Sequence, residues 1–242
     1  MFCEDCCAPC YNAVDDGHTT GLSMETPLAL TRDVVISSFA YVLGDFPFRS
    51  ILRVDQVASR LSDMRLEYVE PESPVTEAIR QRRGGEINEL DRTLLHSLPI
   101  AAGWNTLLGA VRTQTSLPAT QRELAICRVA ALNLAWFEWK HHYPLALQAG
   151  VNDTLLQLVK KGREWDTHNC ESQVETVEFR ILLRYTDYMT VDIKVPDELF
   201  EVMKGMWSEK EILELTMVIA SYNMVSRVLV ALDVGEMSKT EL

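Results

Sequence analysis

Signals that start and stop helices recur at short intervals from residue 64 onward, and they limit the fold more than any other feature of this chain. Ser73-Pro74 has the pattern of a helix start, and Gly84-Gly85 has the pattern of a helix end. Thr120-x-x-Glu123 and Ser208-x-x-Glu211 have the spacing of a capping box, in which the two side chains bond free backbone N–H groups of the first turn. Signals for β-strands are few. The sequence therefore predicts an all-α fold, most simply a helical bundle.

The predicted helices follow one another with short connections, as is usual in such a bundle. The longest is a strongly apolar stretch in the middle of the chain, which we expect to pass through a kink near Trp136 and to stop at Gly150. The predicted helices cover residues 73–83, 89–97, 100–115, 120–149, 152–162, 174–190, a stretch that begins at Pro196, and 208–232.

The composition is that of an ordinary globular protein, with 47% hydrophobic and 24% charged residues among 242. A chain of this length buries roughly 70–75% of its unfolded surface, so a core can form without metals or disulfides. The formal charge of −12 and the lack of a long basic run argue against nucleic-acid binding. The longest apolar stretches considered, Val34–Gly44 and Ser97–Val111, are too short or too polar for a membrane helix, so we expect no membrane span.

Residues 1–63 differ in character from the rest of the chain. We predict an N-terminal extension of unknown role, partly disordered, ahead of a helical domain over 64–242. The first 20 residues contain four acids and no basic segment followed by an apolar one, so we expect no secretory leader and a cytoplasmic location.

Four of the six cysteines lie within the first ten residues. Cys3-x-x-Cys6 is followed directly by Cys7-x-x-Cys10, a spacing that suits zinc or an iron–sulfur centre. No second ligand cluster follows, so a reduced, flexible tail is the simpler interpretation and a metal-binding module stays an alternative. Cys127 lies in an apolar stretch and is predicted to be a small buried side chain.

Glu138 and His142 are four residues apart in the segment Trp136–His142, so on a helix they share one face and can touch. A carboxylate beside an imidazole fixes its tautomer and raises its pKa, which makes an acid/base unit near neutral pH. Trp136 and Trp139 would add an apolar wall that excludes water. A surface Glu–His pair with no chemical role is the simpler alternative, and the spacing does not separate the two.

Glu123 and Arg128 are further candidates on the apolar stretch before this segment. Glu123 is explained by its capping box with Thr120, although a carboxylate at a helix start can also face a pocket. Arg128 lies inside the helix, where a cation is unusual, and is a candidate for binding a substrate carboxylate. The arginines of Arg80–Arg83 most simply complement the end of a helix.

These residues resemble the carboxymuconolactone decarboxylase-like, or AhpD-like, family. The resemblance rests on Arg122–Ile126, on Glu138-Trp139-x-x-His142 and on Pro144–Gly150, and it extends less sharply over residues 64–236. It implies an AhpD-like helical bundle. The matches that look like the fungal and bacterial branch of single-chain homologues are Arg82-Arg83-Gly84-Gly85, Leu90-Asp91-Arg92 and Gly103-Trp104-Asn105.

The peroxidase members of that family use a Glu…Cys-x-x-Cys-x-x-x-His relay. Glu123 and His142 match its glutamate and histidine, but the two cysteine positions hold Ala135 and Glu138. A disulfide-forming peroxidase needs a thiolate to attack the peroxide. The sequence therefore argues against peroxiredoxin-type alkylhydroperoxidase activity at this site.

The decarboxylase branch implies a cofactor-independent reaction on a small unsaturated or lactone carboxylic acid, either a decarboxylation by a lyase or an isomerisation. By this resemblance His142 is the general acid/base, Glu138 its orienting partner and Glu123 a second proton-relay carboxylate. The resemblance also implies a homo-oligomer, a trimer or a hexamer, and secondary metabolism or the degradation of aromatic compounds is the expected setting. The candidates for substrate binding are Arg128, Trp139 and Trp104, the last with core packing as its simpler interpretation. The main alternative is a non-catalytic helical protein for binding or assembly.

Overall fold

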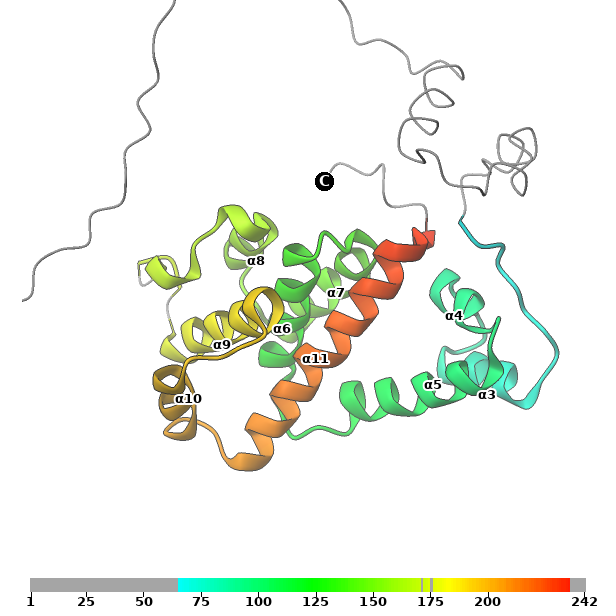
Figure 1. Ribbon diagram of the computed structural model, residues 1–242, viewed down its shortest axis with the longest axis horizontal. Coiled ribbons are helices and arrows are strands. Elements are labelled where there is room, and N and C mark those ends of the chain that lie inside the picture. The colour runs from blue at the N-terminus through cyan, green and yellow to red at the C-terminus, as the bar shows by residue number, and fades with distance from the viewer. Residues whose placement is uncertain (1–64, 171, 175, 236–242) are drawn as a thin grey trace, which may run out of the picture. The chain divides into compact units, whose positions relative to one another are not determined.

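A computed structural model describes residues 65–170, 172–174 and 176–235, and these residues form α-helices with no β-strand. The all-α prediction is confirmed, and the helices lie close to their predicted positions (Figure 1). The helices are α3 (Pro74–Arg82), α4 (Glu89–Leu94), α5 (Leu98–Thr113), α6 (Ala119–Leu132), α7 (Trp136–Ala149), α8 (Asp153–Lys160), α9 (Val177–Asp187), α10 (Asp197–Lys204) and α11 (Glu209–Leu232). The predicted N-terminal extension, with Cys3, Cys6, Cys7 and Cys10, lies outside the described residues.

Most of the predicted helix ends are formed by the expected side chains. Ser73 accepts a hydrogen bond from the backbone N–H of Thr76 at the start of α3. Ser208 and Glu211 form a complete capping box at the start of α11. Gly150 ends α7 with a φ of 99°, a left-handed conformation that glycine adopts at little cost.

The capping box predicted for Thr120 and Glu123 does not form. Helix α6 begins at Ala119, with Pro118 rather than Thr120 at its N-cap and no side-chain capping bond. The carboxylate of Glu123 bonds His142 instead of the start of its own helix. The prediction was wrong because a tertiary partner for Glu123 comes from another helix, which a local spacing rule does not include.

The expected kink near Trp136 is a full break between two helices. Leu134 has a φ of 55°, which a non-glycine side chain rarely adopts, and the chain turns there from α6 into α7. The backbone N–H of Ala135 bonds the carbonyl of Ala130 across the turn at 2.8 Å. The break lets α7 pack against α6, so that side chains of the two helices meet in the interior.

Helix α6 is the centre of the core. From Glu123 to Leu132 every side chain is buried, as expected of a helix that is covered on all sides. It packs against α7, α8, α9 and α11. Figure 1 shows α11 crossing in front of this core, with α3 to α5 on one side of it and α8 to α10 on the other.

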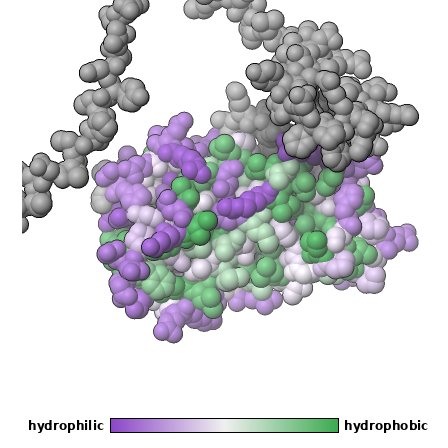
Figure 2. All heavy atoms as spheres, in the orientation of Figure 1, coloured by the Kyte–Doolittle hydropathy of each residue, from purple (hydrophilic) through white to green (hydrophobic). Residues whose placement is uncertain are grey.

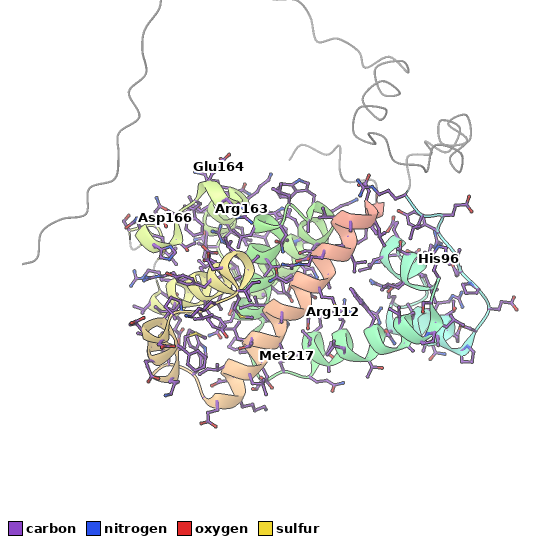
Figure 3. All side chains as sticks on the ribbon, viewed as in Figure 1. His96, Arg112, Arg163, Glu164, Asp166 and Met217 are labelled. Atoms are coloured by element: carbon purple, nitrogen blue, oxygen red, sulfur yellow. The ribbon has the colours of Figure 1, made fainter. Side chains whose placement is uncertain are left out.

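By length and composition alone, helix α11 is long and apolar enough to cross a membrane. The sequence had predicted this helix, but no membrane span. Half of the apolar part of this helix is buried inside the protein, as in the core helix of a globular fold. The other half keeps apolar side chains at the surface, among them Leu213 and Val230. Figure 2 shows apolar atoms on the face that α11 crosses, and Met217 is labelled on this helix in Figure 3.

Candidate active site

A small cavity of about 60 Å³ opens where α5, α7 and α11 meet the segment between α3 and α4. Because one water needs roughly 10–15 Å³ of such space, the cavity has room for roughly four to six waters or a small ligand. Its lining is apolar on one part and rich in titratable groups on another. The lining residues are Arg83, Asn88, Leu90, Trp104, Leu108, Arg112, Phe137, Glu138, His141, His142, Tyr222, Val225 and Leu229.

His142 is held in this lining by Glu123. Its Nδ1 atom lies 2.7 Å from Oε2 of Glu123, and both side chains are buried. Nδ1–H donates this bond to the Glu123 carboxylate, which leaves Nε2 as the ring nitrogen available to a bound molecule. Burial lowers the pKa of His142, and the bond to Glu123 opposes that effect. The imidazole is therefore favoured in its neutral form, which can accept a proton.

Glu138 lines the same cavity but does not orient His142, contrary to the expectation from their spacing. Its Oε2 atom accepts a hydrogen bond of 3.0 Å from the hydroxyl of Ser226 on α11. Its Oε1 atom is buried and has no hydrogen-bond partner in the described part of the chain. Burial raises the pKa of Glu138 well above its usual value, so this carboxyl is favoured in its protonated form.

Arg112 and Tyr222 line the cavity, although neither was indicated by the sequence as a site residue. Arg112 lies in the last turn of α5, where a basic residue is already explained by the helix end. Tyr222 lies in the long apolar stretch of α11, where an aromatic side chain is already explained by core packing. The ring of Tyr222 meets that of His142 edge to face, with centroids 4.9 Å apart. That Arg112 is on the side of α5 that faces the cavity can be known only from the positions of the helices.

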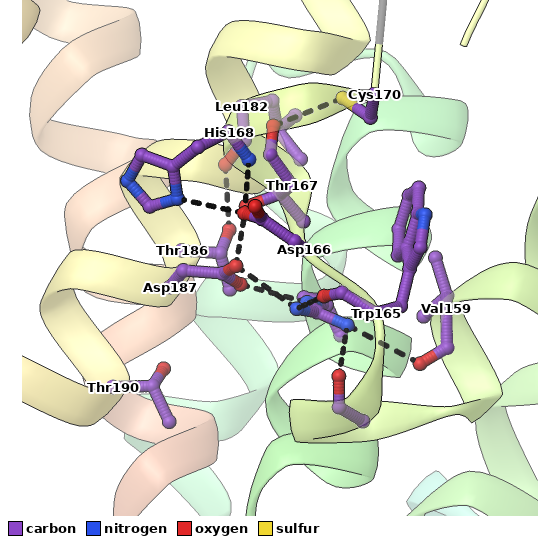
Figure 4. A network of polar contacts seen from close by, with 12 residues as sticks. Val159, Trp165, Asp166, Thr167, His168, Cys170, Leu182, Thr186, Asp187 and Thr190 are labelled. Atoms are coloured by element: carbon purple, nitrogen blue, oxygen red, sulfur yellow. Dashed lines mark hydrogen bonds and ion pairs between the residues drawn. The ribbon is translucent and has the colours of Figure 1, made fainter. Parts of the chain in front are cut away.

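Arg128 is not a substrate-binding residue in this structure. Arg128 is 1% exposed and forms a bidentate ion pair with Asp187. Its Nε atom lies 2.7 Å from Oδ1 of Asp187, and its Nη2 atom lies 2.9 Å from Oδ2. The remaining N–H groups donate to the carbonyls of Val159, Gly162 and Trp165. Figure 4 shows the carboxylate of Asp187 in this network, together with Val159 and Trp165. The prediction was wrong because Asp187 at the end of α9, together with carbonyls of α8 and of the loop after it, satisfies all of the guanidinium donors.

The two predicted tryptophans have different positions. Trp104 lines the cavity from α5. Trp139 is buried away from the lining and stacks on Tyr143, with ring centroids 5.7 Å apart. It therefore packs the core of the α7 region, although its helix carries both Glu138 and His142. Arg83 also lines the cavity, but it is paired with the buried carboxylate of Asp91.

The two described cysteines lie apart from the cavity lining. Cys127 is buried, as predicted, and burial raises the pKa of its thiol well above the usual value. Cys170 is also buried and donates to the carbonyl of Thr167. Neither is placed to give the reactive thiolate that peroxide reduction needs. Within the described residues, His, Cys, Asp and Glu side chains form no group of three or more that could hold a metal ion.

Comparison with known proteins gives a family match for one part of the chain that lines this cavity. Residues 99–164 match the model of the carboxymuconolactone decarboxylase family. The matched segment contains Glu123, Glu138 and His142. No curated protein matches the chain at a significant level.

Two solved structures have a similar fold. An uncharacterized peroxidase-related protein from Silicibacter sp. TM1040 is 14% identical, with a TM-score of 0.58 over 72% of this chain and 91% of its own. A protein of unknown function from Agrobacterium tumefaciens, by its name a candidate antioxidant defence protein AhpD, is 22% identical, with a TM-score of 0.52 over 62% of this chain and 96% of its own. At these identities the likeness concerns the fold alone. The chain therefore has a carboxymuconolactone decarboxylase-like region over residues 99–164, set in an AhpD-like helical fold.

Proposed function

We propose that this protein is a cofactor-independent acid/base enzyme, a decarboxylase or an isomerase, that acts on a small unsaturated or lactone carboxylic acid. One observation carries the proposal. Glu138 and His142 line the same cavity, and their pKa values are shifted in opposite directions. A pair of titratable groups whose environments separate their pKa values is the usual basis for assigning an acid and a base.

The protonation states give each group a role. Glu138 is favoured as a neutral carboxylic acid and can donate a proton, whereas the neutral His142 can accept one through Nε2. Glu123 fixes the ring orientation and stabilises the imidazolium that forms when His142 takes up a proton. The sequence had assigned the positioning role to Glu138, and the geometry supports exchanging the roles of the two glutamates.

Both reaction types fit this pair of groups. In an isomerisation, His142 removes a proton from a carbon next to the unsaturated system, and Glu138 returns a proton to another carbon. Solvent then moves the proton from His142 back to Glu138. In a decarboxylation, the bond to the leaving carboxylate breaks, its electron pair enters the conjugated system, and Glu138 protonates the resulting carbanionic carbon. Solvent then restores the proton of Glu138.

The relatives with peroxidase-related and antioxidant-defence names support an alternative in redox chemistry. The two described cysteines weigh against it, since both are buried and lie apart from the cavity lining. A small, polar cavity in a helical fold would also suit a non-catalytic binding protein, so the test has to measure chemistry.

The test is solvent-proton exchange. The purified full chain is incubated in D₂O with a panel of small unsaturated and lactone acids, and NMR follows deuterium incorporation and release of carbon dioxide. We expect exchange or release with at least one acid, reduced at least about 100-fold in His142→Asn and in Glu138→Gln. His168→Asn is the control, because His168 is exposed and lies outside the cavity lining.

Two results would contradict the proposal. Full exchange by His142→Asn would remove the histidine from the reaction. A folded wild-type protein that binds members of the panel but catalyses neither exchange nor release would favour the non-catalytic binding protein.

A further inference from the structure

Buried polar atoms without a partner gather around the cavity. The described residues contain four buried side-chain polar atoms that lack a hydrogen bond, and two of them, Oε1 of Glu138 and Oη of Tyr222, belong to cavity-lining residues. A buried donor or acceptor left without a partner costs about 1–3 kcal/mol, so proteins rarely keep one without a reason. Two such atoms on one small cavity are explained if a bound molecule supplies their partners.

Arg112 adds a cation with spare donors to the same lining. Its Nε atom donates to the carbonyl of Leu108 at 3.0 Å, and no carboxylate of the described residues pairs with its guanidinium. Arg83 also lines the cavity, but its Nε atom is paired with the carboxylate of Asp91, which Arg82 shares. Arg112 lines the same cavity as His142 and Tyr222. Arg112 is therefore the arginine of the cavity that has no carboxylate partner within the described residues.

Tyr222 supplies a neutral donor beside this cation. Its side chain is 2% exposed, and burial raises the pKa of its hydroxyl far above the usual value. The hydroxyl thus keeps its proton and can donate it to an oxygen of a ligand. Its ring lies edge to face against His142, so a ligand held by Tyr222 is also beside the imidazole.

We propose that Arg112 and Tyr222 bind the carboxylate of a small monoanionic substrate and hold it beside Glu138 and His142. The inference rests on the proposed function, because it names the substrate class of that same site. One cavity cation without a carboxylate partner in the described part of the chain matches one negative charge on the ligand. The space of about 60 Å³ limits the buried part of the ligand to a few non-hydrogen atoms.

This anchor also separates the two reaction types. A cation bound to a leaving carboxylate stabilises the ground state and raises the barrier to loss of carbon dioxide. A monocarboxylate held by Arg112 therefore keeps its carboxylate while a proton moves elsewhere in the molecule. The geometry favours an isomerase of small unsaturated monocarboxylates over a decarboxylase of the same acids.

A binding experiment tests the anchor without any turnover. Isobutyrate is the probe, because it is a small saturated acid without the unsaturated system that the proposed reaction needs, and isobutyramide is its neutral counterpart. Calorimetric titration of the full chain should show at least about tenfold tighter binding of the acid than of the amide. Arg112→Gln should abolish this preference, and Tyr222→Phe should reduce it severalfold.

Arg227→Gln is the matched control. Arg227 bonds the carbonyl of Asn223 four residues earlier, as Arg112 bonds that of Leu108, but it lies outside the cavity lining. This variant should keep the wild-type preference. Unchanged isobutyrate binding in Arg112→Gln, or equal binding of acid and amide by the wild type, would overturn the inference. Tight, Arg112-dependent binding without proton exchange on any unsaturated acid would leave the anchor standing and remove the proposed function.

Discussion

Arg128 and Arg112 lie on consecutive helices, and their surroundings differ in one decisive respect. Arg128 is 1% exposed, and its guanidinium is bonded to Asp187 and to three backbone carbonyls. Arg112 is partly exposed and bonds only the carbonyl of Leu108 among the described residues. The first region is complete without a ligand, whereas the second has spare donors next to two unpartnered buried oxygens. A charged side chain inside a fold thus indicates a ligand site only when the protein itself does not supply its hydrogen-bond and ion-pair partners.

The largest expected effect is on stability, at the completed region. Arg128→Met should lower the free energy of unfolding by about 3–5 kcal/mol, because it leaves the carboxylate of Asp187 largely buried without its cation. Urea denaturation measures this difference. Arg112→Met is the matched control and should stay within about 0.5 kcal/mol of the wild type. Similar losses in both variants would erase the contrast between the two regions.

A second effect concerns the hydrogen bond between Glu123 and His142. Glu123→Gln keeps a hydrogen-bond partner for His142 but removes the negative charge. The tautomer with the proton on Nδ1 is then less strongly favoured. We expect the rate of proton exchange to fall by at least about 100-fold, with a further lowered His142 pKa in an NMR titration. A wild-type rate in this variant would show that Glu123 has only a packing role.

A third effect is the pH dependence of stability at Glu138. Because burial raises the pKa of Glu138 in the folded state, folding favours the protonated carboxyl. Its contribution to stability is fully present below the unfolded pKa of about 4.5 and is lost as the pH rises toward the folded pKa, by about 1.4 kcal/mol per pH unit.

Glu138→Gln removes this dependence, so its free energy of unfolding relative to the wild type should increase with pH. Denaturation between about pH 5 and pH 8 measures the difference. His142 acts in the opposite direction, since its lowered pKa costs stability as the pH falls below 6.5, but it is present in both proteins and cancels. A difference that does not change with pH would mean that Glu138 is ionised in the folded protein.

The smallest effect is expected at Tyr222. Tyr222→Phe removes a buried hydroxyl that has no hydrogen-bond partner, so the free energy of unfolding should change by less than about 0.5 kcal/mol or increase slightly. Thermal and urea denaturation test this expectation. A loss above about 1.5 kcal/mol would show that the hydroxyl is bonded within the protein, and it would weaken the assignment of this atom to a ligand.

The local parts of the fold could be predicted from the sequence. Ser208 and Glu211 form the expected capping box, and Gly150 ends α7 as expected. These features depend on residues within one turn of each other, so a single sequence carries the full information. The all-α class follows from the same signals, because a chain whose predicted segments are all helices can form its core only by packing helix against helix.

The candidate site was predicted only in part, for a geometric reason. His142, Glu138 and Glu123 were named from motif and resemblance, and the structure brings all three into one region. Their pairing was wrong, because two residues on one face of α7 can have partners on different helices. Glu138 bonds Ser226 of α11, which is 88 residues away in the chain.

The sequence by itself determined the helices, most of their ends and the titratable residues available for chemistry. The tertiary structure decided which of those residues are satisfied and which face the cavity. It paired Arg128 with Asp187 and left Arg112 with spare donors, although both are arginines on largely apolar helices. Burial and hydrogen bonding depend on contacts between helices from distant parts of the chain. These two effects shift the pKa values of Glu138 and His142 away from the usual values of their residue types.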